Sequence, residues 1–161
     1  MSSVLFVCLG NICRSPLAEG VFRQLAGAAG LDLLIDSAGT GDWHIGHAPD
    51  PRSQAVAARH GVDISGLRAR QLTADDFSRF AHIIVMDDSN RENIRAWEPE
   101  RHEARVNLLL DFVPGRAGEA VPDPYYGGPE DFEETYRLVR AGAEGLLRAI
   151  VGGGVAAGQA E

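Results

Sequence analysis

Short apolar runs alternate along the chain with segments whose apolar residues recur every three or four positions. The runs are rich in β-forming residues and predict four buried strands, over residues 4–7, 31–35, 83–86 and 106–110. Helical spacing predicts a first helix after the first strand, with an apolar face formed by Leu17, Ala18, Val21, Phe22 and Leu25. A last helix is predicted from Pro129, with an apolar face formed by Phe132, Tyr136, Val139, Ala143, Leu146, Leu147 and Ile150.

Capping and turn residues predict the remaining elements. Gly30 is a suitable stop for the first helix, and residues 53–60 predict a short second one. Thr73 is a suitable N-cap for a further helix over residues 73–80. Residues 87–90 read as a helix entry directly after the third strand.

Strands that are separated by helices indicate a parallel sheet with right-handed crossovers and helices on both faces. The predicted fold class is therefore α/β, a three-layer sandwich around a central four-stranded parallel sheet. A single domain over residues 1–151 contains all these elements, and the small, glycine-rich residues 152–161 predict a flexible C-terminal tail. Because such sheets bind ligands at the carboxyl ends of their strands, the loop after the first strand is a candidate site.

The amino-acid composition excludes some classes of binding partner. The 161 residues are 45% apolar and 24% charged, as in an ordinary globular domain, and the net charge of −8 argues against a nucleic-acid partner. We expect no membrane partner and a cytoplasmic location, because no apolar stretch is long enough to span a bilayer and no signal-like segment is present. Cys8, Cys13 and the five histidines form no convincing metal site, and a surface role is favoured over ligation for His44 and His47. The patch Arg68-Ala69-Arg70 is interpreted as a solvated face that could also meet acidic partners.

The segment from Val7 to Pro16 reads Val-Cys-Leu-Gly-Asn-Ile-Cys-Arg-Ser-Pro and joins the first strand to the first helix. A loop in this position offers backbone N–H groups to an oxyanion, and the helix adds its positive end. Cys8 would be the nucleophile, since a thiolate forms at neutral pH more readily than an alkoxide. The guanidinium of Arg14 matches two phosphoryl oxygens. The prediction is a phosphate-binding loop whose other residues are Leu9, Gly10, Asn11, Ile12, Cys13 and Ser15.

Individual loop residues carry further predictions. Gly10 lets the backbone turn close to the anion, and Asn11 tolerates the positive φ that such a loop often requires. Ser15 is a suitable N-cap, and its hydroxyl could also donate to the Cys8 sulfur as that sulfur becomes a leaving group. Cys13 has two readings, a packing residue behind the loop or a resolving thiol that protects Cys8 through a reversible disulfide.

A second segment of chemical interest follows the fourth strand. Residues 121–128 form a proline-stiffened loop in which Asp123 is the best candidate for a general acid that protonates the departing oxygen. The adjacent Tyr125 and Tyr126 suit the walls of a slot for an aromatic substrate.

These two segments, in this order and at this distance, resemble the low-molecular-weight protein tyrosine phosphatases. The resemblance covers about residues 4–147 and includes the segments 36–40, 59–61, 69–72, 85–87 and 123–127. It implies that Cys8 attacks phosphorus to form a cysteinyl-phosphate, and that Arg14 holds the equatorial oxygens. It also implies that Asp123 protonates the leaving phenolate and then activates the water that releases phosphate.

The resemblance implies further features of the site. Asn11, Ser15 and Ser37 match positions that brace the loop, and Trp43 matches a variable aromatic position on the rim. No metal or cofactor is required in this family; the substrate would be a phosphotyrosine protein or a small aryl phosphate, and the product inorganic phosphate. Several relatives also carry a histidine bonded to the bracing network. Residues 65–68 offer none, so we expect a bracing that is looser or built differently.

Three other readings stay in view. Arsenate reductases of this fold use the same loop but pass electrons through further cysteines, and this chain has none after Cys13. A phosphotyrosine-binding module without catalysis would keep Arg14 but could dispense with Cys8 or Asp123. A thiol-redox protein would usually space its cysteines two apart.

Overall fold

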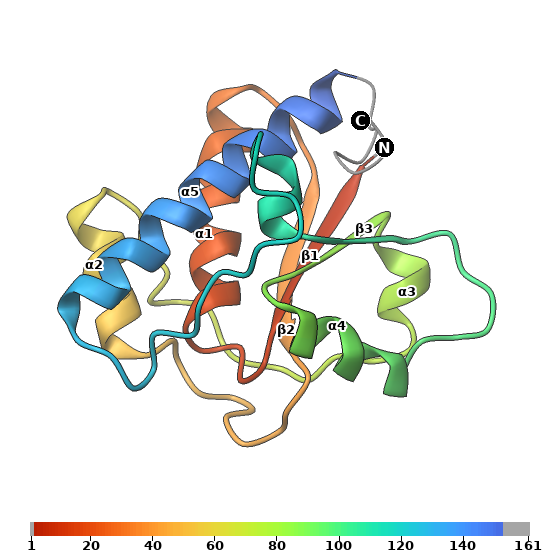
Figure 1. The fold of residues 1–161 in the computed structure, drawn as a ribbon, viewed down its shortest axis with the longest axis horizontal. Coiled ribbons are helices and arrows are strands. Elements are labelled where there is room, and N and C mark those ends of the chain that lie inside the picture. The colour runs from red at the N-terminus through yellow and green to blue at the C-terminus, as the bar shows by residue number, and fades with distance from the viewer. Residues whose placement is uncertain (1, 153–161) are drawn as a thin grey trace.

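A parallel sheet of four strands forms the centre of residues 2–152, the part of the chain that the computed structural model describes (Figure 1). The strands are β1 (Ser3–Cys8), β2 (Leu34–Gly39), β3 (His82–Val85) and β4 (Arg105–Leu108). They lie in the order β2-β1-β3-β4, so β1 is an inner strand and its carboxyl end lies between β2 and β3.

Helices cover both faces of this sheet (Figure 1). The first layer contains α1 (Arg14–Ala28), α2 (Pro51–Arg59) and the long α5 (Pro129–Val151). The opposite layer contains the shorter α3 (Asp76–Arg79) and α4 (Asp88–Asn93), followed by a short 3₁₀ helix over Ile94–Ala96. A second 3₁₀ helix, over Leu109–Phe112, packs against α5 on the first face. This three-layer α/β arrangement confirms the predicted fold class.

Alternating side chains along β1 divide the hydrophobic core in two. Val4, Phe6 and Cys8 belong to the cluster formed with α1 and α5, whereas Leu5 and Val7 belong to the cluster on the other face. Every residue of β1 is buried, as expected for an inner strand of a parallel sheet. Cys8 is therefore the last residue of a strand that is packed on both sides.

Two predicted strands had boundaries that were wrong by more than one residue. The second strand begins at Leu34 and continues to Gly39, because it pairs with β1 from Ser3–Leu34 to Cys8–Gly39. Its last residues are small or polar, so an apolar-run criterion misses them. The fourth strand ends at Leu108, because the chain then enters a 3₁₀ helix in which Leu109 packs against α5.

Helix starts also needed correction. Ser15 is not the N-cap of α1, which begins one residue earlier at Arg14, although Pro16 does lie in the first turn. Thr73 is not a helix cap either: α3 has four residues, and the Thr73 N–H donates to the Asp76 carboxylate at 2.9 Å. The start of α2 lies at Pro51, two residues before the predicted one, because Asp50 caps it by accepting the Arg52 N–H.

No helix formed by residues 2–152 combines the length and the apolarity that a membrane crossing requires. Of the predicted tail over residues 152–161, only Gly152 lies within the described residues.

Candidate active site

The loop between β1 and α1 lies at the carboxyl edge of the sheet, where the fold predicts a ligand site. Asn11 has φ 57°, which confirms the left-handed conformation predicted for it. The neighbouring end of β2 must be small, since a Cβ on Gly39 would lie 2.8 Å from the Leu9 carbonyl oxygen. The loop is therefore wrapped tightly against β2.

The sulfur of Cys8 lies at the base of this loop. Cys8 is 3% exposed, and its Sγ atom is 3.0 Å from the Ser15 hydroxyl oxygen. Because Ser15 is in the first turn of α1, the sulfur lies beside the positive end of a 15-residue helix. This surrounding favours an anion at the sulfur or directly above it.

Arg14 is almost completely buried and held by groups that are far away in the sequence. Its NH1 donates to the Asp87 carboxylate at 2.7 Å and to the Val121 carbonyl at 2.9 Å. Its NH2 lies 3.7 Å from an Asp123 carboxylate oxygen. Burial by itself would lower the pKa of Arg14, but the nearby Cys8 and Asp87 outweigh it and raise that pKa. The guanidinium therefore stays charged at the site.

A cavity of about 420 Å³ opens above the loop. It is lined by Cys8, Leu9, Gly10, Ile12, Cys13, Arg14, Trp43, His44, Asp123, Tyr125 and Tyr126. All the residues predicted to bind substrate line it except Asn11 and Ser15, which lie behind the loop wall. Two segments more than a hundred residues apart in the sequence thus share one cavity.

His44, for which the sequence indicates a surface role and not metal ligation, lines the opening of this cavity. A Cβ placed on Gly10 would lie 3.1 Å from its Cδ2 atom, so the ring packs closely over the loop. The glycine-rich context of His44 in the sequence carries no signal for this position, because the loop folds back onto the site only in three dimensions.

Aromatic side chains form the rim of the cavity. Trp43 is 64% exposed and Tyr126 is 96% exposed, whereas Tyr125 is less accessible and packs edge-on against Tyr126. The guanidinium carbon of Arg52 lies 5.4 Å from the centre of the Tyr125 ring and 4.6 Å from that of Phe132. The Tyr125 wall is thereby supported from α2.

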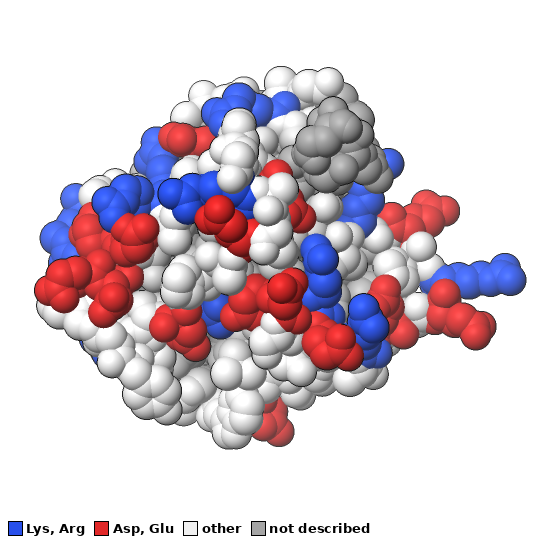
Figure 2. Space-filling model, in the orientation of Figure 1, with Lys and Arg blue, Asp and Glu red and all other residues white. Residues whose placement is uncertain are grey.

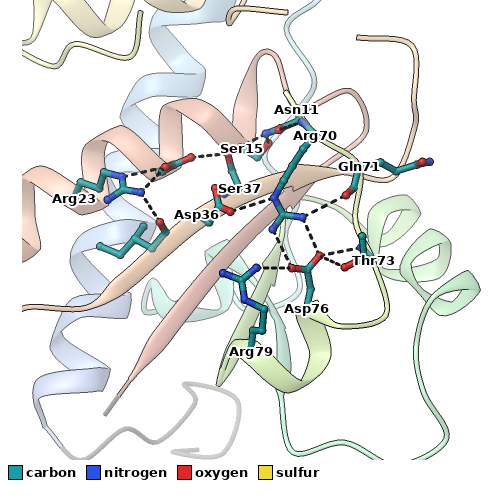
Figure 3. A network of polar contacts seen from close by, with 12 residues as sticks. Asn11, Ser15, Arg23, Asp36, Ser37, Arg70, Gln71, Thr73, Asp76 and Arg79 are labelled. Atoms are coloured by element: carbon teal, nitrogen blue, oxygen red, sulfur yellow. Dashed lines mark hydrogen bonds and ion pairs between the residues drawn. The ribbon is translucent and has the colours of Figure 1, made fainter. Parts of the chain in front are cut away.

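Hydrogen bonds behind the loop connect the Asn11 side chain to α1, to β2 and to the segment that contains Arg70 (Figure 3). The Asn11 amide nitrogen donates to the hydroxyls of Ser15 at 2.7 Å and of Ser37 at 3.0 Å. The Asn11 amide oxygen accepts the backbone N–H of Arg70 at 3.0 Å. These contacts join the three predicted bracing residues, and no histidine takes part in them.

Arg70 is not a solvated surface residue as interpreted from the sequence. Its guanidinium forms ion pairs with Asp36 at 3.1 Å and with the buried Asp76 at 2.9 Å (Figure 3). These pairs hold the backbone whose N–H reaches Asn11. Sequence reasoning missed this role because the two carboxylates lie on different elements, β2 and α3.

Cys13 lies near Cys8, and both thiols are free. Burial, followed by the negative charges of Asp50 and Cys8, raises the pKa of Cys13 to about 12. The packing role and the resolving role of Cys13 stay as alternative predictions.

The surface shows mixed charges. Figure 2 shows acidic and basic groups interspersed over one face, with acidic groups gathered over the beginning of α5, where Glu130 and Asp131 occupy the first turn. Within residues 2–152, no group of three or more His, Cys, Asp or Glu side chains is arranged to hold a metal ion.

Comparisons with known proteins give a consistent result. The family model for low molecular weight phosphotyrosine protein phosphatase matches residues 3–153. The low molecular weight protein-tyrosine-phosphatase of Streptomyces coelicolor is 47% identical, over 91% of this chain and 92% of that protein. The YfkJ phosphatase of Bacillus subtilis is 45% identical, over 93% of this chain and 96% of that protein.

Solved structures agree with the sequence comparisons. The crystal structure of the Entamoeba histolytica protein tyrosine phosphatase with Hepes in its active site has a TM-score of 0.89 at 32% identity, covering 96% of this chain and 100% of that one. The crystal structure of Bacillus subtilis YfkJ has a TM-score of 0.87 at 44% identity, and the match covers 94% of this chain and 96% of that one. The chain therefore belongs to the low molecular weight phosphotyrosine protein phosphatases, a family of hydrolases.

Proposed function

We propose that Cys8, Arg14 and Asp123 are the catalytic residues of a phosphotyrosine phosphatase that works through a cysteinyl-phosphate. The observation that carries this proposal is the shared cavity. It brings the Cys8 sulfur, the Arg14 guanidinium and the Asp123 carboxylate together, with Arg14 NH2 and Asp123 only 3.7 Å apart. A nucleophile, a cation and an acid are the groups that this reaction needs.

Substrate binding would begin with the phosphate. Its equatorial oxygens would accept hydrogen bonds from the loop amides of Leu9, Gly10, Ile12 and Cys13 and from Arg14. The aromatic ring would lie between Trp43 and Tyr125, with Tyr126 at the outer edge. The substrate would be a phosphotyrosine protein or a small aryl phosphate.

Chemistry would then proceed in two displacements. The Cys8 thiolate attacks phosphorus, the bond from phosphorus to the phenolic oxygen breaks, and protonated Asp123 gives its proton to that oxygen. In the second displacement, the Asp123 carboxylate takes a proton from water as the water oxygen attacks phosphorus. The sulfur leaves as a thiolate that accepts a hydrogen bond from Ser15, and inorganic phosphate departs. Arg14 and the loop amides supply the charge stabilisation, so no metal or cofactor takes part in these steps.

The mechanism needs Cys8 as a free thiol. Both cysteines are free in the structure. A reducing compartment maintains that state, so we place the enzyme in the cytoplasm.

The test is hydrolysis of p-nitrophenyl phosphate and of a phosphotyrosine peptide in the presence of a chelator, with a phosphoserine peptide as a comparison. The matched variants are Cys8→Ser and Cys13→Ser. Turnover that is lost only in Cys8→Ser supports the proposal. Equal turnover in wild type and Cys8→Ser would overturn it, and peptide binding without turnover in the reduced wild type would favour a binding module.

A further inference from the structure

A buried carboxylate behind the loop is not used in the proposed mechanism. Glu19, in the second turn of α1, is 2% exposed. Its Oε1 accepts the Ser37 hydroxyl at 2.7 Å, and its Oε2 accepts from Arg23 Nε at 3.0 Å. Burying an ionised carboxylate is costly unless it is paired and hydrogen-bonded. The hydrogen bonds from Ser37 and Arg23 therefore offset the cost of burying the Glu19 carboxylate.

The charge of Glu19 determines which way the neighbouring hydroxyl points. An ionised carboxylate can only accept hydrogen bonds, so Ser37 must donate its single hydroxyl hydrogen to Glu19. The lone pairs of Ser37 then face Asn11, whose amide nitrogen donates to it at 3.0 Å. Asn11 cannot reverse its amide without losing the Arg70 N–H, which donates to its oxygen at 3.0 Å.

The hydrogen bonds continue from Asn11 to the nucleophile Cys8. The Asn11 amide nitrogen also donates to the Ser15 hydroxyl oxygen at 2.7 Å, which occupies one lone pair of Ser15. The hydroxyl hydrogen of Ser15 is then free for the Cys8 sulfur, 3.0 Å away. The direction of the Ser15 bond therefore rests on the Asn11 amide, which is held at two points, by the Arg70 N–H at its oxygen and by the acceptor Ser37 at its nitrogen.

We propose that Glu19, held in its charged form by Arg23, is a positioning residue that orients the hydrogen bond from Ser15 to the Cys8 sulfur. This inference rests on the proposed function, because the orientation matters most when that sulfur leaves the cysteinyl-phosphate. Glu19 touches neither the substrate nor the sulfur, and acts through Ser37, Asn11 and Ser15.

Arg23 has a specific part in this arrangement. Burial raises the pKa of Glu19, and the hydrogen bonds from Ser37 and Arg23 oppose that rise, while the nearby Asp36 adds to it. A neutral Glu19 could donate to Ser37 instead of accepting from it, so Ser37 would no longer be fixed as the acceptor for Asn11. Arg23 also donates to the Ile35 carbonyl, which ties α1 to β2 (Figure 3). Arg23 is the cation that contacts the Glu19 end of the network.

The substitution Glu19→Gln separates charge from shape. Arg23 offers only donors, so the new amide oxygen would turn toward Arg23 and the new amide NH₂ toward Ser37. Ser37 would then face two donors, the introduced amide and the amide of Asn11. Its hydroxyl hydrogen would lose the acceptor that fixes its direction, and its bond with Asn11 would weaken. The matched control is Glu144→Gln, which removes the same charge from an exposed i,i+4 pair with Arg140 on α5.

The first measurement is the steady-state kinetics of aryl phosphate hydrolysis at a temperature where each variant is folded. The rates are divided by the concentration of active sites, which is determined by titration. We expect kcat of Glu19→Gln to fall about tenfold with KM within about twofold, since one charged hydrogen bond is misdirected. Glu144→Gln should match the wild type. A second measurement, alkylation of Cys8 by iodoacetate, should also slow in Glu19→Gln alone, because the thiolate loses its oriented donor.

A double-mutant cycle with Ser15→Ala tests the route. If Glu19 acts through Ser15, Glu19→Gln should add little to the loss of kcat already caused by Ser15→Ala. If the two substitutions reduce kcat additively, the proposal is overturned. It is also overturned if Glu19→Gln has the same kcat and the same alkylation rate as Glu144→Gln. Should Glu19→Gln not fold, Arg23→Gln replaces it; its activity should fall most at acid pH, where Glu19 takes up a proton, and an unchanged pH profile would refute the role of Arg23.

These outcomes separate the two proposals. A wild-type protein without phosphatase activity would contradict the proposed function, whereas the alkylation rates would still test whether Glu19 orients the group beside the sulfur.

Discussion

Replacing Asp87 with asparagine removes the charge that balances the buried guanidinium of Arg14. The two side chains meet at 2.7 Å, and Arg14 is 2% exposed. Asp87 also caps α4 by accepting the Asn90 N–H at 2.7 Å. Because asparagine is as good an N-cap as aspartate, the substitution keeps the cap and changes mainly the ion pair.

The magnitude follows from what remains around Arg14. Removing one partner of a buried ion pair costs about 3–5 kcal/mol, and the asparagine oxygen can retain one hydrogen bond, so we expect a loss of about 2–4 kcal/mol in the free energy of unfolding. For a chain of this size, that loss lowers the melting temperature by about 4–16 °C. Asp123, whose side chain is 43% exposed and 3.7 Å from Arg14, compensates little.

The assay is urea unfolding with and without inorganic phosphate, read from the transition midpoint at constant slope. Phosphate bound in the loop would supply the missing negative charge, so the difference between wild type and Asp87→Asn should shrink at saturating phosphate. The control Asp88→Asn changes an exposed carboxylate in the first turn of the same helix and should stay within about 0.5 kcal/mol of wild type. An Asp87→Asn protein as stable as Asp88→Asn in the absence of phosphate would refute this account of the site.

Three further predictions concern the acid, the second thiol and the packing of the helices. Asp123→Asn should slow hydrolysis most for esters of weakly acidic phenols, by about 10²–10⁴-fold, and an equal loss across a series of leaving groups would contradict its role as acid. With a pKa of about 12, Cys13 should be alkylated far more slowly than Cys8 at pH 8, which peptide mass spectrometry can measure, and comparable rates would show that burial does not protect it. Gly145→Ala should destabilise the protein by about 1–3 kcal/mol in thermal unfolding, because its Cβ would clash with the Phe112 backbone carbonyl oxygen. Gly27→Ala, whose Cβ would meet nothing within 4 Å, should instead be stabilising.

Local signals in the sequence were sufficient for much of the fold. The periodic apolar faces of α1 and α5 and the short runs of β1 and β3 are contiguous in the chain, so pattern and propensity predicted them. The unusual backbone of Asn11 was also predictable, because the tolerance of that residue for positive φ is a local property. The ends of β2 and β4 were not, because pairing with a neighbouring strand decides where a strand stops.

The loop and the aspartate of the candidate site were likewise visible as motifs. The residues that support them were not, because charge pairing depends on distance in space and not in sequence. Arg14 is 73 residues from Asp87 and 107 residues from Val121. Arg70 reads as one more surface arginine until Asp36 and Asp76 lie beside it.

By itself, the sequence determined which reactive groups the protein carries. These are a candidate nucleophilic cysteine and an arginine in a strand-to-helix loop, and a distant aspartate beside two tyrosines. Only the tertiary structure decided how those groups are held, which is through the buried partners of Arg14 and through the hydrogen bonds that run from Glu19 to Cys8. The physical reason is burial. A charged group removed from water must find its partner within a few ångströms, and parallel crossovers bring those partners together from remote parts of the chain.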